Sequence, residues 1–373
     1  LSLLATPIFA AESPGAPPSE VVSNISTLAD LENPKNDVQF GPLLVLTPAQ
    51  WRKAREIYRS EAAAKTAFAR TVAVAEAALR ATPQPLRELI YEGRVETDPE
   101  RVATKKRLGD MLRLRALVYA WGVTGEKKYA DKAREFALAW AKTFEPVANP
   151  INAAKLDSVI FAAIALKDEF SPDETAILGD WMRRFAARQS EGTKGGNWET
   201  KRLKLLALLG TALGEKSLHE RAVDGLQTYI AKDLRADGTS HDLELRDAMS
   251  YHISGLTPML EAAVLLGPLA SEIYEYQAPN GASFQKSVEF VAPFARGEKE
   301  YLQWTNSKIA LDKKRWESGD EHYRPGSKWK PTSSRGLWEL AQFADPKWQE
   351  FAAKFSGDDN WTGVLARAAR DEN

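Results

Sequence analysis

The sequence predicts an all-α fold, an incomplete α/α toroid of antiparallel helix pairs with minor irregular or β segments near the C-terminus. Helical patterns alternate with short breaks at Gly or Pro from about residue 48 to residue 270. Several segments, such as 203–213, are apolar around most of the helix, so neighbours must cover them on two sides. A ring or arc of helix pairs provides this cover, with buried inner and amphipathic outer helices. A superhelical repeat array is the alternative, although no fixed-period repeat is visible.

The expected helices begin and end at recognisable cap signals. Thr47-Pro-Ala-Gln50 and Ser171-Pro-Asp-Glu174 each place a hydroxyl at the N-cap, Pro at the first helical position and Gln or Glu at the third. Glycines such as Gly125 and Gly214 mark helix ends. The patterns predict helices over about 48–81, 100–122, 127–143, 152–168, 172–189, 198–213, 216–233 and 246–266.

The pattern changes after residue 280. Three apolar stretches there fit either strands or short helices, at 288–294, 301–304 and 308–311. A loop-rich stretch covers 317–335, a helix is expected at 335–343, and a further one near 345–355.

Composition excludes several classes of protein. The chain has 373 residues, with 50 Lys and Arg against 51 Asp and Glu, so it lacks the basic excess that nucleic-acid binding requires. It contains no Cys and only four His, which excludes thiol nucleophiles and Cys-ligated zinc or iron–sulfur centres. We therefore expect chemistry from oxygen, imidazole or guanidinium groups, with no cofactor and no bound metal.

The N-terminal region predicts export. Residues 1–11 contain a short apolar run ending in small residues, which is typical of the remnant of a secretory signal peptide. Residues 12–46 are expected to form an extended lead-in, and 47–373 a single catalytic toroid domain. No later stretch reaches the roughly 20 apolar residues of a membrane span. The expected protein is a secreted or periplasmic monomer.

A first polar patch lies at 195–202, where a glycine turn leads into an apolar helix. Asn197 fits an N-cap; alternatively, its amide and the helix N-terminus approach a substrate carboxylate. Trp198 fits either stacking on a sugar or packing in the core. Lys201 and Arg202 add positive charge.

A second patch, 237–252, contains His241, Arg246, Tyr251 and His252. On a regular helix, Arg246 and Tyr251 would point about 140° apart. They meet at one site only if the helix starts late or a substrate spans the gap. The structural alternative for Tyr251 and His252 is a buried, hydrogen-bonded aromatic pair.

A third patch, 296–330, has nine Lys or Arg and six Asp or Glu, and it also carries aromatic side chains. A solvated charged face would explain it. Together the three patches fit a groove for an anionic sugar chain, in which cations meet carboxylates and aromatic rings stack on sugars. The candidate contacts from this patch are Trp304, Lys308, Arg315 and His322.

The patches resemble the alginate lyase superfamily of polysaccharide lyases over roughly residues 100–320. The resemblance is carried by Asn197 at its Gly-rich helix start, by Arg246-Asp-Ala-Met-Ser-Tyr-His252 followed by 256–260, and by the stretch from Trp140 to Asn152. It implies an incomplete α/α toroid that cleaves 1,4-linked polyuronates by β-elimination without an essential metal, and Asn152 joins the candidate substrate contacts. The family commonly has Asn-Asn-His where this chain has Gly196-Asn197-Trp198. The missing His indicates a divergent branch, for which glucuronan is as suitable as alginate.

The expected chemistry assigns roles to the catalytic candidates. Asn197, with Arg246 or a nearby His, would neutralise the uronate carboxylate so that H5 becomes acidic. In mannuronate and glucuronate H5 and O4 lie on one side of the ring, so Tyr251 alone can act as base and then as acid. Guluronate would require a second base, for which His241 is the best candidate, with His252 and His322 behind it. The missing His favours syn elimination.

Two other functions fit parts of the pattern. An inverting α/α-barrel glycoside hydrolase needs two carboxyl groups, which Glu199, Asp242 or Glu244 could supply, but it leaves Arg246 and Tyr251 unused. A non-catalytic periplasmic polysaccharide-binding protein would use the aromatic and basic residues without turnover.

Overall fold

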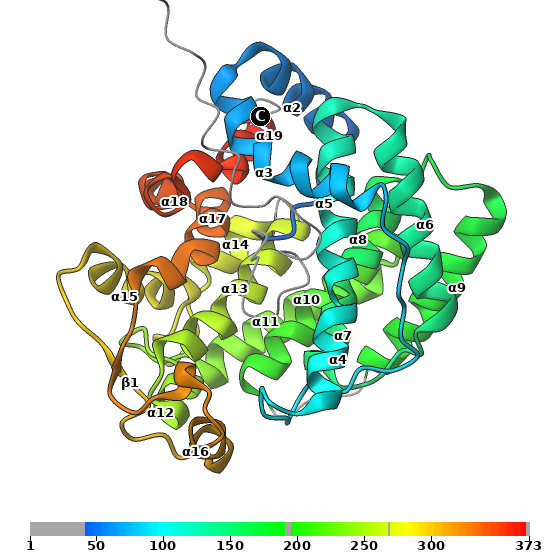
Figure 1. Cartoon of the computed structure of the whole chain (residues 1–373). Helices are drawn as coiled ribbons and strands as arrows, with labels where there is room; N and C mark the ends of the chain where they lie inside the picture. The colour runs from blue at the N-terminus through cyan, green and yellow to red at the C-terminus, as the bar shows by residue number, and fades with distance from the viewer. Residues whose placement is uncertain (1–41, 191–194, 268, 371–373) are drawn as a thin grey trace, which may run out of the picture.

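The structure is a computed structural model that describes residues 42–190, 195–267 and 269–370. In this part of the chain the helices form an α/α toroid, as predicted (Figure 1). The signal remnant expected at 1–11 and the lead-in up to residue 41 lie outside the described residues. No helix among the described residues is long and apolar enough to cross a membrane.

The described helices and strands follow one another with short connections. The first half contains α2 (Pro48–Ser60), α3 (Ala62–Ala78), α4 (Pro99–Arg107), α5 (Gly109–Thr124), α6 (Lys127–Thr143), α7 (Pro150–Ala153), the 3₁₀ turn η1 (Ala154–Leu156), α8 (Asp157–Ala165) and α9 (Pro172–Gln189). The middle contains α10 (Gly196–Leu213), α11 (Lys216–Asp233), α12 (His241–Arg246), α13 (Met249–Leu265), α14 (Leu269–Glu275) and α15 (Phe284–Arg296). The last part contains β1 (Leu302–Gln303), α16 (Ala310–Glu317), η2 (Glu321–Tyr323), β2 (Ser327–Lys328), η3 (Pro331–Ser334), α17 (Arg335–Ala344), η4 (Pro346–Trp348), α18 (Gln349–Ser356), η5 (Gly357–Asp359) and α19 (Trp361–Arg370).

Among the described residues, five helices form the inner layer of the toroid. Helices α5, α8, α10, α13 and α17 contact one another in that order, and α6, α9, α11 and α18 cover them from outside. The inner helices α10 and α13 are buried along most of their length. Helix α19 packs against α2 and α3, so the two ends of the described chain meet (Figure 1). This is the two-sided cover that the apolar segments predicted.

The capping signals hold where the sequence placed them. Thr47 and Ser171 each accept a hydrogen bond from the backbone of the third helical residue, whose side chain accepts one in return, which makes two complete capping boxes. The predicted bounds of 127–143, 172–189 and 216–233 are confirmed.

Other elements differ from the prediction in their boundaries. The helix expected over 48–81 is divided at Glu61, whose backbone is extended. The helix expected over 246–266 begins only at Met249, because Asp247 is left-handed with φ 50° and ψ 48°. The stretch 288–294 belongs to helix α15, whereas 301–304 contains strand β1, which pairs antiparallel with β2. Helix α19 was not predicted.

The close packing of α2 on α5 makes a glycine necessary. A Cβ on Gly122 would lie 2.2 Å from the buried ring of Trp51. Gly122→Ala is therefore expected to lower the free energy of unfolding by about 1–3 kcal/mol, measured by urea denaturation. Gly336→Ala in the first turn of α17, where a Cβ would meet nothing within 4 Å, is the matched control and should be neutral or slightly stabilising. Equal stabilities of the two variants would contradict the argument.

Candidate active site

The inner helices and the segment 303–339 surround a cleft of about 1680 Å³. Its charged lining is mostly basic, although the whole chain has a formal net charge of −1. The basic side chains are Lys105, Lys106, Arg115, Lys155, Lys201, Lys204, Lys328, Lys330 and Arg335, and the acidic ones are Asp157, Glu261, Glu321 and Glu339. The cleft therefore concentrates positive potential that the whole-chain balance hides.

Tyr251 lines this cleft and contacts two of the residues expected beside it. The Arg246 guanidinium lies 3.9 Å from the centroid of its ring, and Trp304 meets the ring edge-on with centroids 5.7 Å apart. Arg246 and Tyr251 meet because α13 starts late, at Met249, which is one of the two ways in which the sequence allowed them to share a site. Arg246 also forms an ion pair with the buried Asp312, so its position over the ring is held from both sides.

The hydroxyl of Tyr251 lies in a second polar cluster. Arg315 Nη1 donates to the Tyr251 hydroxyl at 3.3 Å and to the Tyr323 hydroxyl at 2.7 Å, and the two hydroxyls are 3.3 Å apart. Burial raises the pKa of Tyr323, and the neighbouring Tyr251 adds to this. Tyr323 did not emerge from the sequence, because it lies 72 residues from Tyr251.

The third patch is held in place by hydrogen bonds to the second patch. The backbone N–H of Trp304, which has φ 65°, donates to the carbonyl of Asp247 at 2.7 Å. Gln303 Oε1 accepts from the backbone of Ser250 at 3.0 Å and so caps the first turn of α13. His322 lines the cleft with an exposed side chain, and its ring packs against that of Trp304.

The start of α10 differs from the expectation. Asn197 is not the N-cap; Gly195 is, with φ 84°, and Asn197 lies buried in the first turn. The expected free N–H groups are occupied, because the carboxylate of Asp233 accepts from Gly196 at 3.0 Å and that of Asp242 accepts from the backbone of Asn197. Protein carboxylates therefore hold the position that a substrate carboxylate was expected to take.

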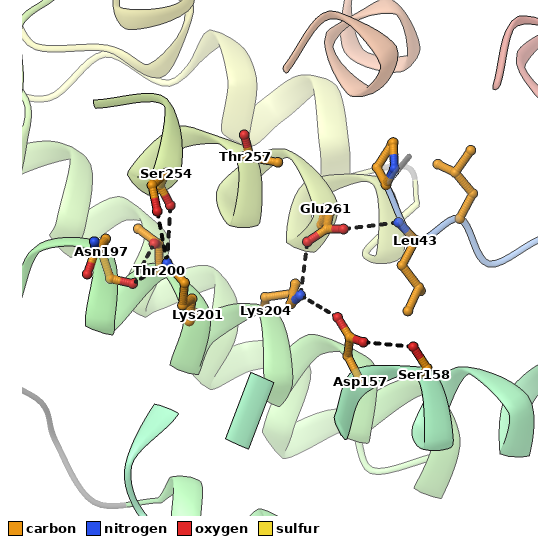
Figure 2. Close-up of polar contacts among 12 residues, drawn as sticks. Leu43, Asp157, Ser158, Asn197, Thr200, Lys201, Lys204, Ser254, Thr257 and Glu261 are labelled. Atoms are coloured by element: carbon orange, nitrogen blue, oxygen red, sulfur yellow. Dashed lines mark hydrogen bonds and ion pairs between the residues drawn. The ribbon is translucent and has the colours of Figure 1, made fainter. Parts of the chain in front are cut away.

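Lys201 projects from the second turn of α10 into the cleft. Its Nζ lies 3.2 Å from Ser254 Oγ and 3.4 Å from the carbonyl oxygens of Ser254 and Asn197 (Figure 2). Burial lowers the pKa of Lys201 to about 7, and the charge of Lys155 acts in the same direction. This ammonium is near its titration point at neutral pH.

Lys204, one turn further along α10, belongs to a buried ion network that sequence reasoning missed. Its Nζ lies 2.8 Å from Asp157 Oδ2 and 3.0 Å from Glu261 Oε2 (Figure 2). Arg115 donates to the other oxygen of Asp157 at 2.8 Å, and the backbone of Leu43 donates to Glu261 at 3.0 Å. Burial disfavours the charged forms, but the pairing outweighs it, so the pKa of Asp157 is lowered and that of Lys204 is raised.

These network residues do carry a sequence signal. Arg115, Asp157, Lys204 and Glu261 each stand within a strongly apolar helical segment. A charged residue there must either face a cleft or pair with an opposite charge, because an unpaired buried charge is very costly.

His252 lies in the core rather than in the cleft. It is 1% exposed; Nε2 donates to the carbonyl of Ser287 at 3.1 Å, and Nδ1 accepts from Ser240 Oγ at 2.8 Å. Burial lowers its pKa to about 4, so the ring is neutral. This placement corrects the assignment of His252 to substrate binding and fits the structural alternative.

The remaining candidates do not line the cleft in this structure. The Asn152 amide donates to the carbonyl of Leu89 and accepts from the backbone N–H of Glu92. Arg202 forms an ion pair with Glu199 on its own helix. Both side chains have structural partners that account for them. His241 and Trp198 are half-buried and Lys308 is exposed, all outside the cleft wall. Of the thirteen candidates, the cleft wall thus contains Lys201, Tyr251 and His322, and three more, Arg246, Trp304 and Arg315, contact Tyr251.

Fold and site together define an α/α-toroid protein with a basic cleft. The alginate lyase family model matches residues 52–301, and the chain belongs to this family. It is therefore a polysaccharide lyase, as the sequence resemblance implied. None of the curated proteins compared with the chain matches it.

Solved structures share the fold at low sequence identity. An alginate lyase from Bacteroides ovatus is 16% identical, with a TM-score of 0.63 over 88% of this chain and 99% of that chain. Two variants of alginate lyase A1-III complexed with a tetrasaccharide, one with His replaced by Ala and one with Tyr replaced by Phe, are each 16% identical, with a TM-score of 0.57 over 87% of this chain and 96% of that chain. At this identity the likeness establishes the fold.

Proposed function

We propose that this lyase cleaves 1,4-linked polyuronates, either polymannuronate-type alginate or glucuronan, by β-elimination that leaves a 4,5-unsaturated uronide. The observation that carries the proposal is Tyr251, which faces a basic cleft with one arginine over its ring and another donating to its hydroxyl. A negatively charged chain fits the cleft electrostatically. The proposal includes secretion or a periplasmic location, supported by the apolar run at residues 1–10.

Tyr251 is assigned the proton transfers. Its oxygen, as phenolate, takes H5; the C5–H electron pair forms the C4=C5 double bond; the C4–O4 bond breaks; and Tyr251 returns the proton to O4. No net proton is gained or lost in this step. Arg315 and Arg246 would interact favourably with negative charge on the Tyr251 oxygen. In this assignment Arg246 supports Tyr251 rather than holding the substrate, because Asp312 already pairs with it.

The arrangement of candidate bases supports syn elimination. Tyr251 lies at the cleft wall beside Arg246. Two of the three candidate second bases, His241 and His252, lie outside that wall, whereas His322 lines it with its ring against Trp304 and is the remaining candidate base for guluronate. A single group on one side of the sugar can serve substrates in which H5 and O4 share that side, as in mannuronate and glucuronate. Guluronate, which needs a base on the opposite side, is expected to be the poorer substrate.

An absorbance assay tests the proposal. Incubation with polymannuronate or glucuronan should generate the ultraviolet absorbance of a C4=C5 double bond, faster than incubation with polyguluronate and unchanged by a metal chelator. New reducing ends without absorbance would indicate the glycoside hydrolase alternative. Absence of both signals with all three polymers would contradict the proposed substrates.

A further inference from the structure

We propose that Lys201 is the residue that captures the uronate carboxylate beside Tyr251, and that capture is coupled to uptake of one proton from solvent. The inference rests on the proposed function, since it names how that site selects an acidic sugar. It makes Lys201 a specificity-determining residue of the elimination reaction.

The contrast between two lysines on one helix carries the argument. Lys204 has two carboxylates within 3.0 Å, so its charge is already satisfied by the protein. Lys201, three residues earlier and on the same cleft wall, contacts two carbonyls and a hydroxyl, and these are neutral acceptors. Figure 2 shows the two ammonium groups in these different surroundings. A carboxylate entering the cleft thus gains more at Lys201 than at Lys204, because at Lys201 it would supply an opposite charge in direct contact.

The position of Lys201 fits the carboxylate of the sugar that reacts. Its ammonium contacts Ser254, which follows Tyr251 by three residues on α13, a rise of about 4.5 Å along the helix. Ser254 and Tyr251 both line the cleft. Lys201 and Tyr251 thus border the same stretch of the cleft, and the proposal places the uronate carboxylate on Lys201 with its C5 toward the Tyr251 side chain. Neutralising that carboxylate stabilises the enolate-like charge that forms when H5 leaves.

The surroundings of Lys201 make its charge depend on the ligand. The charged groups around it are Lys155 on η1 and Lys204 on α10, which disfavour a further positive charge, and Asp242 on α12 and Glu261 on α13, which favour it. Burial outweighs the favourable pair and lowers the pKa of Lys201 to about 7. A bound carboxylate raises this pKa, because an opposite charge in contact favours the ammonium. Above pH 7, substrate binding must then take up a proton.

Calorimetric titration measures the coupling directly. The Tyr251→Phe protein, used so that the polymer stays intact, is titrated with a mannuronate oligomer at pH 6 and pH 8 in buffers of different ionisation enthalpy. Uptake of about 0.5–0.9 proton per site is expected at pH 8, with much less at pH 6. The same protein carrying Lys201→Arg should take up almost none, because arginine is already charged. Lys216→Arg, on the outer face of α11, is the control and should leave the uptake unchanged.

Kinetics separate capture from a direct role as a base. In the otherwise unaltered enzyme, Lys201→Arg should keep kcat within about tenfold and remove the rise in KM above pH 7. A loss of kcat of about 10²-fold or more with unchanged KM would overturn the proposal and make Lys201 the base. Proton uptake that persists in the Lys201→Arg protein would overturn it as well. If the unaltered enzyme forms no unsaturated product from any polyuronate, the proposed function is wrong. If it forms product but its KM does not depend on pH, the proposed role of Lys201 is wrong while the proposed function stands.

Thermal unfolding supplies a check that needs no substrate. In the unfolded chain Lys201 has an ordinary pKa of about 10.4, so charging it in the folded protein costs stability. This cost is complete below pH 7 and disappears as the pH rises toward 10. Lys201→Met is accordingly expected to raise the unfolding midpoint more at pH 6 than at pH 10. A midpoint change that is the same at both pH values would contradict the lowered pKa.

Discussion

Replacing Tyr251 by phenylalanine should lower kcat for polyuronate cleavage by about 10²–10⁴-fold, the range that a lost general acid–base group removes. Only the hydroxyl group is removed, while the ring keeps its contacts with Arg246 and Trp304. Binding should therefore survive, and KM should change by less than about tenfold. Initial rates of ultraviolet absorbance at saturating polymer give kcat, and circular dichroism verifies the fold.

Two other tyrosines show whether the effect is specific. Tyr129→Phe on the outer helix α6 removes a hydroxyl that donates to Glu76, and neither residue lines the cleft, so kcat should be unchanged. Tyr323→Phe removes one neighbour of the Tyr251 hydroxyl but leaves Arg315 in place, and an intermediate loss is expected. Retention of more than a tenth of the kcat by Tyr251→Phe would end its assignment as acid and base.

Replacing Lys204 by methionine should lower the free energy of unfolding by about 3–5 kcal/mol, since it leaves the buried Asp157 and Glu261 without their shared cation. All three side chains are less than one-tenth exposed, so solvent can do little to replace the lost charge. Arg115 and the backbone of Leu43 would remain as partial compensation. Urea denaturation followed by tryptophan fluorescence measures the change.

The comparison variants isolate the ion network. Lys216→Met removes an exposed lysine that pairs with Glu220, and its cost should stay below about 1 kcal/mol. Combining Lys204→Met with Glu261→Gln removes one of the orphaned charges and should recover part of the loss, a coupling that a double-mutant cycle quantifies. A cost below about 1 kcal/mol for Lys204→Met alone would show that the network does not stabilise the fold.

The ion network of Arg115, Asp157, Lys204 and Glu261 lies where four inner helices meet at the wall of the cleft. Asp157, Lys204 and Glu261 come from the inner helices α8, α10 and α13, and Arg115 from α5. One set of ion pairs therefore ties four inner helices together at the wall of the cleft. We expect the stability effect of Lys204 and the binding effect of Lys201 to be separable, although the two residues are one helical turn apart.

Much of the fold could be predicted because its causes are local. The capping boxes at Thr47 and Ser171, the glycine after α5 and the apolar periodicity of α6, α9 and α11 each act within a few residues. Helix boundaries could not be predicted where contacts with a distant segment accompany an unusual backbone conformation. Asp247 adopts its left-handed conformation where its carboxylate accepts from Tyr301 at 2.9 Å and from the backbone of Asn306 at 2.9 Å. No local signal marks that break in the helix.

The candidate site also has a part that the sequence predicted and a part that only the structure shows. The residue types and their clustering identified Tyr251, Arg246, Arg315, Trp304, Lys201 and His322 as candidates from sequence alone, and the family resemblance fixed the class of reaction. The same patterns also selected His252 and Arg202, and the resemblance added Asn152; the partners of these three side chains in the structure are those of packing and helix stabilisation. A pattern of residue types records which chemistry is available, but not which side chain turns toward the cleft.

The sequence by itself determined the helical periodicity, the caps, the absence of thiol chemistry and the membership of a polysaccharide lyase family. Tertiary structure alone decided that Arg246 lies over Tyr251 and that Tyr323 and Arg315 meet its hydroxyl. It also decided that Lys204 pairs with carboxylates whereas Lys201 contacts neutral acceptors. The physical reason is the sequence distance over which each kind of interaction acts. Backbone periodicity and capping depend on neighbours within one or two turns, whereas charge state and contact depend on which distant helices the toroid brings around the same cleft.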